Sequence, residues 1–190
     1  MSIALFFGSF NPIHIGHLII AQSILLEPEI EQVWFVISPQ NPFKQKENLL
    51  SEHARYYLAQ LAIDDNPKFK ASNIEFSLPK PSYTIDTLNY LQEKYPNKKF
   101  SLLIGGDNLA SLHKWKNYSK IIESYKIYVY KRPQAEIPAI ELNANIKFLN
   151  VPLMDISSTI IRHRIKNNQS IKYLVTDKVM DEIEKAGYYR

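Results

Sequence analysis

Short, nearly continuous apolar runs alternate along this chain with segments of helical periodicity. The apolar runs are bounded by turn or polar residues, a pattern typical of strands buried on both faces of a parallel sheet. The predicted strands are residues 3–7, 32–38, 99–105, 126–130 and 146–150. Another segment, residues 70–77, alternates more strongly between apolar and polar positions and is predicted to lie toward an edge of the sheet.

Apolar residues recur with the period of a helix between and after these runs. Predicted helices cover residues 17–26, 51–63, 84–95, 157–168 and 176–187, with shorter helical patterns at 108–115 and 118–124. Ser51 and Thr84 suit helix starts, and Gly187 suits a helix end. The weakly periodic residues 133–145 are predicted to be a surface excursion.

The alternation of strands and helices predicts an α/β fold. We expect a Rossmann-like, doubly wound, mainly parallel sheet with right-handed crossovers. Residues 1–190 are predicted to form a single domain with a small C-terminal helical part at about 157–190.

The stretch GSFNPIHIGH, residues 8–17, connects the first predicted strand to the first predicted helix. Doubly wound folds bind ligands beyond the carboxyl ends of their strands, so this loop lies at the expected binding edge. Gly8 and Gly16 permit close backbone approach, and the amides at a helix start favour phosphate. His14 and His17 can donate N–H groups to phosphate oxygens there. The loop therefore predicts an anion site.

Simpler explanations exist for parts of this loop. Glycine and proline are ordinary turn residues, and a single histidine is more often a packed or solvated side chain. Zinc needs at least three protein ligands, and no cysteine or nearby cluster of histidine and glutamate supplies the others. Two histidines with two glycines at this edge favour phosphate binding, with no protein-ligated metal.

A second candidate anion site is the stretch ISSTIIR, Ile156 to Arg162. Its serines and threonine open a helical pattern, and Arg162 follows Ser158 by four residues, so the two share a helix face. Hydroxyls, amides and a guanidinium on one surface suit an anion. A capped helix with a solvated arginine is the alternative. Together with the first loop, this stretch could hold the other end of a triphosphate.

Composition narrows the function classes. The 190 residues are 45% hydrophobic and 22% charged, which suits one globular domain. The net charge of +4 is scattered along the chain, so a nucleic-acid-binding patch is not indicated. The absence of cysteine excludes disulfides and thiolate nucleophiles. No window has the roughly 18 apolar residues of a membrane span, and the N-terminal run is too short for a signal peptide. We expect a cytoplasmic protein.

These motifs resemble a known family. GSFNPIHIGH resembles the GxFxPxHxGH signature of adenylyltransferase-type nucleotidyltransferases, and ISSTIIR resembles their ISSTxIR signature. Four further segments are similar to the bacterial nicotinate-nucleotide adenylyltransferase family: SPQNPFK (38–44), PSYTIDTL (81–88), IGGDNLASLHKW (104–115) and YKRP (130–133). The matches extend from residue 3 to the C-terminal YLVTDKVMDEIEKAGYY.

The resemblance implies transfer of the AMP part of ATP to nicotinate mononucleotide, with release of pyrophosphate. It implies that His17, His14 and Arg162 are catalytic, and that Mg²⁺ arrives with ATP. The implied ATP-binding residues are Gly8, Ser9, Phe10, His14, Gly16, His17, Gly105, Asp107, Ile156, Ser157, Ser158 and Arg162. Asp107 would bind ribose or adenosine-side groups, or alternatively cap a helix beginning at Asn108.

For the acceptor mononucleotide, the resemblance implies Lys44, Tyr83, Thr84, Trp115 and Arg132. Trp115 would stack on the pyridine ring, and backbone amides near Thr84 and Trp115 would receive the carboxylate. Lys44 is either a phosphate ligand or a solvated surface lysine. The partners implied are the two small-molecule substrates, without nucleic acid or membrane, and a homo-oligomer is left open.

Some positions depart from the pattern expected of the family. Ser9 and Asn11 stand where Thr and Asp are common, Gly106 where Ala is common, and Thr176 replaces a proline. Asn11 keeps one acceptor oxygen but loses a charge. The phosphate-binding residues are all present.

Rival functions remain open at this stage. The acceptor could instead be nicotinamide mononucleotide or phosphopantetheine. The letters HIGH also occur in class I aminoacyl-tRNA synthetases, but no KMSKS-like segment or anticodon-binding extension accompanies them. A nucleotide-binding sensor without turnover is the non-enzymatic alternative.

Overall fold

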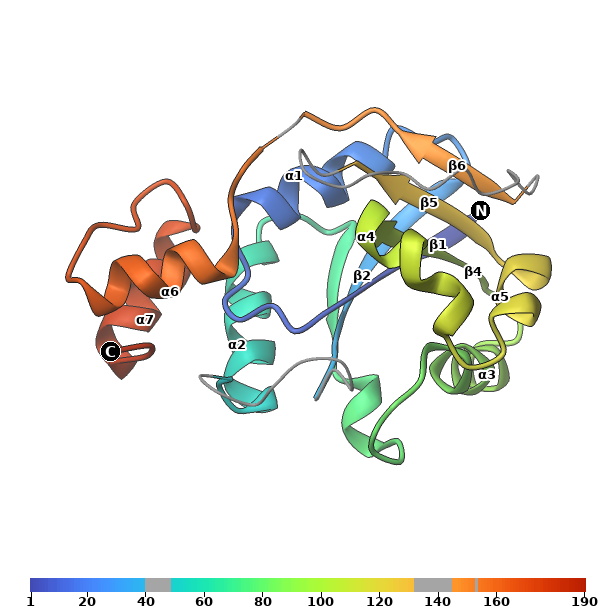
Figure 1. The fold of residues 1–190 in the computed structure, drawn as a ribbon, viewed down its shortest axis with the longest axis horizontal. Helices are drawn as coiled ribbons and strands as arrows, with labels where there is room; N and C mark the ends of the chain where they lie inside the picture. Colours follow the sequence, from blue (N-terminus) through green and yellow to red (C-terminus); the bar gives the residue numbers. More distant parts are fainter. Residues whose placement is uncertain (40–48, 132–144, 153) are drawn as a thin grey trace.

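The computed structural model describes residues 1–39, 49–131, 145–152 and 154–190. Within these ranges the strands form one parallel sheet with the order β3-β2-β1-β4-β5-β6 (Figure 1). The strands are β1 (Ser2–Gly8), β2 (Ile30–Ile37), β3 (Phe69–Ser72), β4 (Lys99–Gly105), β5 (Lys126–Tyr130) and β6 (Ile146–Leu149). The strand order reverses between β1 and β4, which confirms the doubly wound α/β fold.

Helices cover both faces of this sheet. They are α1 (Ile15–Ile24), α2 (Glu52–Ile63), α3 (Thr84–Lys94), α4 (Gly106–Ser111), α5 (Tyr118–Ser124), α6 (Ser158–Lys166) and α7 (Asp177–Ala186), with short 3₁₀ turns η1 (Ile74–Ser77) and η2 (Leu112–Lys114). Side chains of α1, α2, α6 and α7 share a core with one face, and those of α3, α4 and α5 with the other. Helices α6 and α7 lie together at one end of the molecule, beside α2 (Figure 1). None of the helices in the described ranges is both long and apolar enough to cross a membrane.

The apolar runs serve both faces because successive side chains of a strand point to opposite sides. In β1, Ala4 and Phe6 join one buried cluster while Ile3 and Leu5 join the other. This explains why the strands read as continuous apolar runs rather than as alternating patterns.

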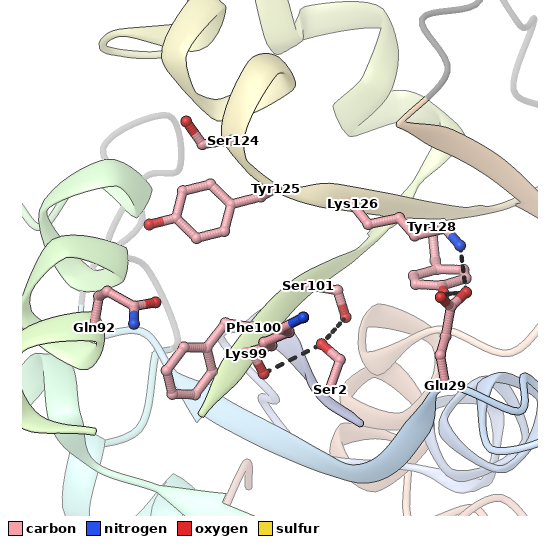
Figure 2. A pocket seen from close by; sticks show the side chains of 10 residues that line it. All are labelled: Ser2, Glu29, Gln92, Lys99, Phe100, Ser101, Ser124, Tyr125, Lys126 and Tyr128. Atoms are coloured by element: carbon pink, nitrogen blue, oxygen red, sulfur yellow. Dashed lines mark hydrogen bonds and ion pairs between the residues drawn. The ribbon is translucent and has the colours of Figure 1, made fainter. Parts of the chain in front are cut away.

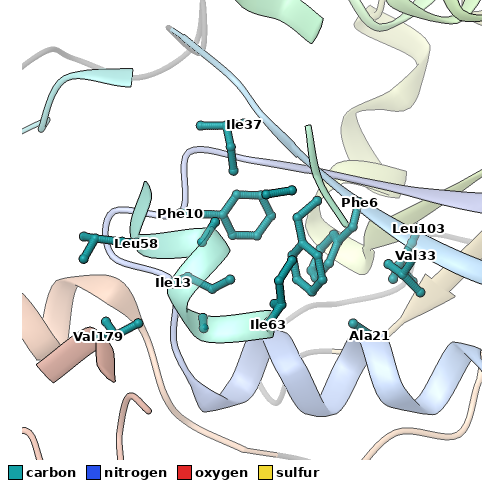
Figure 3. Close-up of a cluster of buried hydrophobic side chains, with 14 of the residues drawn as sticks. Phe6, Phe10, Ile13, Ala21, Val33, Ile37, Leu58, Ile63, Leu103 and Val179 are labelled. Carbon is teal, nitrogen blue, oxygen red and sulfur yellow. The ribbon is translucent and has the colours of Figure 1, made fainter. Parts of the chain in front are cut away.

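The core on the α1/α2 face extends beneath the loop after β1. Figure 3 shows Phe10 beside Ile37, with Ile13 next along the loop, although neither Phe10 nor Ile13 belongs to a helix or strand. Ile161 of α6 and Ile183 of α7 belong to the same buried cluster. We propose on this basis that residues 1–190 form a single domain, with residues 157–190 built onto the same core.

Several local signals are confirmed. The Ser51 side chain accepts a hydrogen bond from the Ala54 amide, and Gly187 ends α7 with a φ of 66°. Residues 70–72 of the predicted edge strand 70–77 are confirmed as part of β3, which lies at an edge of the sheet. Residues 74–77 form the 3₁₀ turn η1, so that part of the prediction was wrong. All but the last residue of the predicted excursion 133–145 lies outside the described residues.

Replacing Ile183 by Ala tests the single-domain proposal. The change removes a side chain that is 2% exposed, so we expect the free energy of unfolding to fall by about 2–5 kcal/mol. One cooperative transition should persist in thermal and denaturant melts, because the C-terminal helices share the core. The control is Lys185→Ala on the exposed face of α7, which should change little. Two separate transitions would contradict a single domain.

Candidate functional site

The loop after β1 folds its aromatic side chain inward. Phe10 has a φ of 45°, in the left-handed region, and its ring is 3% exposed. The ring lies so close to Gly8 that a Cβ added there would be 2.9 Å from it. Gly8 is therefore required by contact with Phe10, which lets the loop backbone turn tightly at the carboxyl end of β1.

The two histidines form a stacked pair at the start of α1. Their ring centroids are 3.7 Å apart with an interplanar angle of 26°. The His14 N–H donates to Nδ1 of His17 at 3.2 Å. Because Nδ1 accepts this bond, a neutral His17 carries its proton on Nε2, which makes Nε2–H a donor. His14 is 6% exposed, whereas His17 is partly exposed.

Gly16 makes room for this pair. A Cβ at Gly16 would lie 3.0 Å from Nδ1 and 3.1 Å from Cε1 of His14. The helix itself begins at Ile15, two residues before the predicted start at residue 17, with His14 as its N-cap. The Ile15 amide donates to the carbonyl of Leu174, while the Gly16 amide donates to no acceptor in the described part of the chain. The helix start thus offers fewer amides than the sequence suggested.

The second motif docks directly onto this loop. Ser158 Oγ donates to the carbonyl of Pro12 at 2.9 Å, and Arg162 Nη1 donates to the carbonyl of Asn11 at 2.8 Å. Ser157 caps α6 by accepting from the Ile160 amide at 3.3 Å. Side chain-to-backbone bonds therefore join two motifs that are about 150 residues apart in the sequence, and they bring the two predicted anion sites together.

Amides at the start of α6 remain available beside that contact. The N–H groups of Ser158 and Thr159 donate to no acceptor among the residues described. The Ser158 hydroxyl already donates to the Pro12 carbonyl, so the backbone amide of Ser158, rather than its hydroxyl, is the donor available to an anion. Ile156 is partly buried and packs against the core, which fixes the approach of the chain to α6.

The carboxyl end of β4 lies across the strand-order reversal from this loop. A Cβ at Gly105 would lie 2.4 Å from Asp107 Oδ1 and 3.2 Å from the Tyr130 ring. Asp107 thus folds back over Gly105. Because α4 already begins at Gly106, with Gly105 as its N-cap, the alternative that Asp107 caps a helix starting at Asn108 is wrong.

The predicted acceptor residues from two segments lie close together. Tyr83 is the N-cap of α3 and Thr84 its first residue. Lys116, next to Trp115, lies with its Nζ 5.0 Å from the Tyr83 ring centroid and 2.9 Å from Asp86 of α3. Within the described ranges, the amides of Thr84 and Lys116 donate to no acceptor. Aromatic rings and open amides therefore occur together here.

A buried carboxylate supports the start of α3. Glu75, on η1, is 3% exposed and accepts hydrogen bonds from Thr87 Oγ1 at 2.8 Å and Ser82 Oγ at 3.0 Å. Burial raises the pKa of Glu75, and these hydroxyl donors act in the opposite direction. The glutamate fixes the segment that carries Tyr83 and Thr84.

The sequence did not reveal two further residues that hold the loop. Arg55 of α2 is 0% exposed and donates to the carbonyl of Ser9. The hydroxyl of Tyr189, near the C-terminus, donates to Oδ1 of Asn11 at 2.9 Å. Arg55 could have been noticed because it shares its helix face with Leu58 and other buried residues, an unusual place for a charge. Tyr189 carries no comparable signal.

Two predicted acceptor residues, Lys44 and Arg132, lie outside the described residues. Their placement stays a prediction.

A cavity of 390 Å³ lies at the opposite, amino-terminal edge of the sheet (Figure 2). It is lined by Ser2, Lys99 and Lys126, which begin β1, β4 and β5. Its polar groups bond to one another, since Glu29 accepts from both Lys126 and Tyr128. None of the predicted site residues lines it.

The chain is similar to known proteins over most of its length. Residues 5–164 match the cytidylyltransferase-like family model. A protein from Cytophaga hutchinsonii, described as "Probable nicotinate-nucleotide adenylyltransferase", is 49% identical over 189 residues, which cover 100% of this chain and 98% of that protein. One of the same description from Caldicellulosiruptor saccharolyticus is 38% identical, with 100% of both chains covered.

The chain belongs to the nicotinate-nucleotide adenylyltransferase family. Among solved structures, the Plasmodium falciparum nicotinic acid mononucleotide adenylyltransferase complexed with NaAD has a TM-score of 0.81 at 22% identity, with 99% of this chain and 97% of that one covered. The same enzyme complexed with APC has a TM-score of 0.80. At 22% sequence identity, this match shows that the two proteins share a fold.

Replacing Gly16 by Ala tests the packing of the histidine pair. The added methyl group would crowd the buried His14 ring, so we expect the free energy of unfolding to fall by about 1–3 kcal/mol and the two rings to separate. Denaturant melts measure the first effect, and shifts of the imidazole proton resonances measure the second. Gln22→Ala, at an exposed position of the same helix, is the control. Unchanged resonances would show that the rings do not depend on Gly16.

Proposed function

We propose that this chain transfers the adenylyl group of MgATP to nicotinate mononucleotide, giving nicotinate adenine dinucleotide and pyrophosphate. The observation that carries the proposal is the docking of α6 on the loop after β1, through Ser158 with Pro12 and Arg162 with Asn11. It brings a guanidinium, two imidazoles and open amides to one edge of the sheet. The family membership supports the same reaction.

The reaction itself needs few chemical groups from the protein. A phosphate oxygen of the mononucleotide forms a bond to the α-phosphorus of ATP, and the bond from that phosphorus to the bridging oxygen of pyrophosphate breaks. The attacking oxygen is already ionised at neutral pH, so no general base is required. Positioning and charge stabilisation are therefore the main tasks of the site.

The histidine pair suits that task. We assign the Nε2–H of His17 to an oxygen of the reacting phosphates, because the His14 N–H occupies Nδ1 and fixes the ring. Arg162 and the amides at the start of α6 suit the leaving pyrophosphate. The triphosphate would lie along the backbone of Gly8, Ser9 and Phe10. Asp107 would bind the ribose.

The start of α3 suits the acid group of the acceptor. The open amides of Thr84 and Lys116 are donors, and a helix N-terminus favours a negative charge. A neutral amide would gain less from the same donors. Trp115 is half-buried and can stack on the pyridine ring.

Three further properties stay predictions: location in the cytoplasm, the absence of nucleic acid as a partner, and the oligomeric state.

A substrate panel tests the proposed reaction. Purified protein with MgATP should release pyrophosphate only when a mononucleotide is added, and nicotinate mononucleotide should be clearly preferred. Nicotinamide mononucleotide and phosphopantetheine are the matched alternatives, and protein without acceptor is the control. Equal or higher rates with nicotinamide mononucleotide would overturn the substrate assignment. Binding of MgATP without turnover on any acceptor would favour a sensor.

Replacing His17 by Ala tests the reacting centre. Loss of one charge-stabilising donor should lower kcat by roughly 10²-fold or more, measured as pyrophosphate release at saturating substrates. His53→Ala, at an exposed position of α2, is the matched control and should retain activity. A His17→Ala variant with near-normal kcat would remove His17 from the reacting centre.

A further inference from the structure

Arg55 is the only arginine in the described residues whose side chain is completely buried, at 0% exposure. It lies on the first turn of α2, and its guanidinium donates to four backbone carbonyls. The acceptors are Leu50 at 3.0 Å, Ser9 at 2.5 Å, Ser38 at 2.9 Å and Pro39 at 3.0 Å. Through these four hydrogen bonds, the guanidinium fixes the positions of the backbone segments that supply the carbonyls.

These carbonyls come from three separate places in the chain. Ser9 follows β1, Ser38 and Pro39 follow β2, and Leu50 precedes α2. Strands β1 and β2 are neighbours in the sheet, so their following residues meet at the carboxyl edge. Arg55 therefore ties the loop after β1 to the residues after β2, at the edge where the triphosphate is proposed to bind.

The charge of Arg55 is attracted by Glu52 of the same helix, which acts to raise the Arg55 pKa, but the two side chains do not form an ion pair. In the described part of the chain, no carboxylate lies within ion-pair distance of its guanidinium. Burial lowers the pKa of the Arg55 guanidinium, because removing the charged form from water is unfavourable. An apolar side chain of similar size would fill the same space without that cost. Packing alone does not explain an arginine here.

The bond to Ser9 also sets the direction of an amide. The carbonyl and the N–H of a trans peptide point in opposite directions, and the Ser9–Phe10 peptide is trans. With the Ser9 carbonyl held on Arg55, the Phe10 N–H must point away from α2. That N–H donates to no acceptor in residues 1–39, 49–131, 145–152 or 154–190. Arg55 thus orients a backbone donor at the loop.

We propose that Arg55 is a positioning residue for the loop after β1, holding the Ser9–Phe10 peptide so that its N–H faces the polyphosphate of the nucleotide. Its positive charge, which has no ion-pair partner among the described residues, adds a positive potential to the same edge, which favours an anionic ligand. The proposal deepens the proposed function and rests on it for the identity of the nucleotide. The assigned effect is on the nucleotide side, through the bond to Ser9. Arg55 also holds Ser38 and Pro39, which precede the predicted acceptor residue Lys44, but it does not bond to the segments that carry Thr84 or Trp115.

The first test is Arg55→Lys, which keeps the charge but loses the planar fork of donors. A small displacement of the loop should lower kcat for adenylyl transfer by about 10²-fold. The Kd for MgATP, measured by calorimetry without an acceptor, should rise about tenfold or more, while the KM for nicotinate mononucleotide should change less than about threefold. Arg164→Lys, at an exposed arginine of α6, is the matched control and should behave as the unchanged protein.

The second test is rescue of Arg55→Ala by free guanidinium at millimolar concentration. The ion should enter the space left by the side chain and restore part of the MgATP affinity and of kcat, whereas sodium at equal ionic strength should not. Thermal melts of both variants show whether they fold. The proposal is wrong if folded Arg55→Lys keeps kcat and the MgATP Kd within twofold, if it weakens both substrates equally, or if both variants lose their cooperative transition.

The two proposals fail in different ways. If the unchanged protein releases no pyrophosphate with any acceptor, the proposed function fails. Calorimetry of MgATP and of inorganic tripolyphosphate still decides the role of Arg55, because neither measurement requires turnover. Loss of tripolyphosphate binding in Arg55→Lys supports the proposal, and unchanged binding overturns it.

Discussion

The loop of residues 9–12 has its carbonyl oxygens bound by side chains from distant helices. Ser9 is held by Arg55 of α2, Asn11 by Arg162 of α6, and Pro12 by Ser158 of α6. A loop at a sheet edge cannot satisfy these carbonyls within itself, so other elements must supply the donors. Because the carbonyl and the N–H of a trans peptide point in opposite directions, holding the Ser9 carbonyl on the protein side leaves the Phe10 N–H for a ligand. Pro12 has no N–H, so the bond to the Asn11 carbonyl fixes the loop without exposing a donor.

Charge at this loop follows from the same bonds. Arg55 and Arg162 approach it from two helices, and Asn11 between them is neutral. Its Oδ1 accepts from the Leu50 amide at 3.2 Å and from the Tyr189 hydroxyl at 2.9 Å. Both donors require only an acceptor oxygen, which Asn supplies as well as Asp does. The asparagine therefore keeps the framework of the loop and leaves the positive potential of the two arginines undiminished toward a polyphosphate.

The sequence predicted the elements well because their signals are local. Apolar runs located the strands, and Ser51, Ser157 and Gly187 marked helix ends through bonds to residues within a few positions. The residues it missed act over long separations. Arg55 reaches Ser9 across 46 positions and Tyr189 reaches Asn11 across 178, so neither bond leaves a periodic pattern. Residues 74–77 failed as a strand because the chain turns there to place the buried Glu75 against Ser82 and Thr87.

The distribution of residues over the sheet explains how one reaction joins two substrates. The loop after β1 and the start of α6 carry the proposed phosphate donors, whereas α3 and the segment after α4 carry the proposed acceptor donors. Strand order reverses between β1 and β4, so the helices following these strands leave toward opposite faces and open a crevice between them. On the proposed assignment, the reacting phosphates would meet at that crevice, because each substrate would be held from one side of it. Such an arrangement favours catalysis by alignment, and a reaction whose nucleophile is already ionised needs little else.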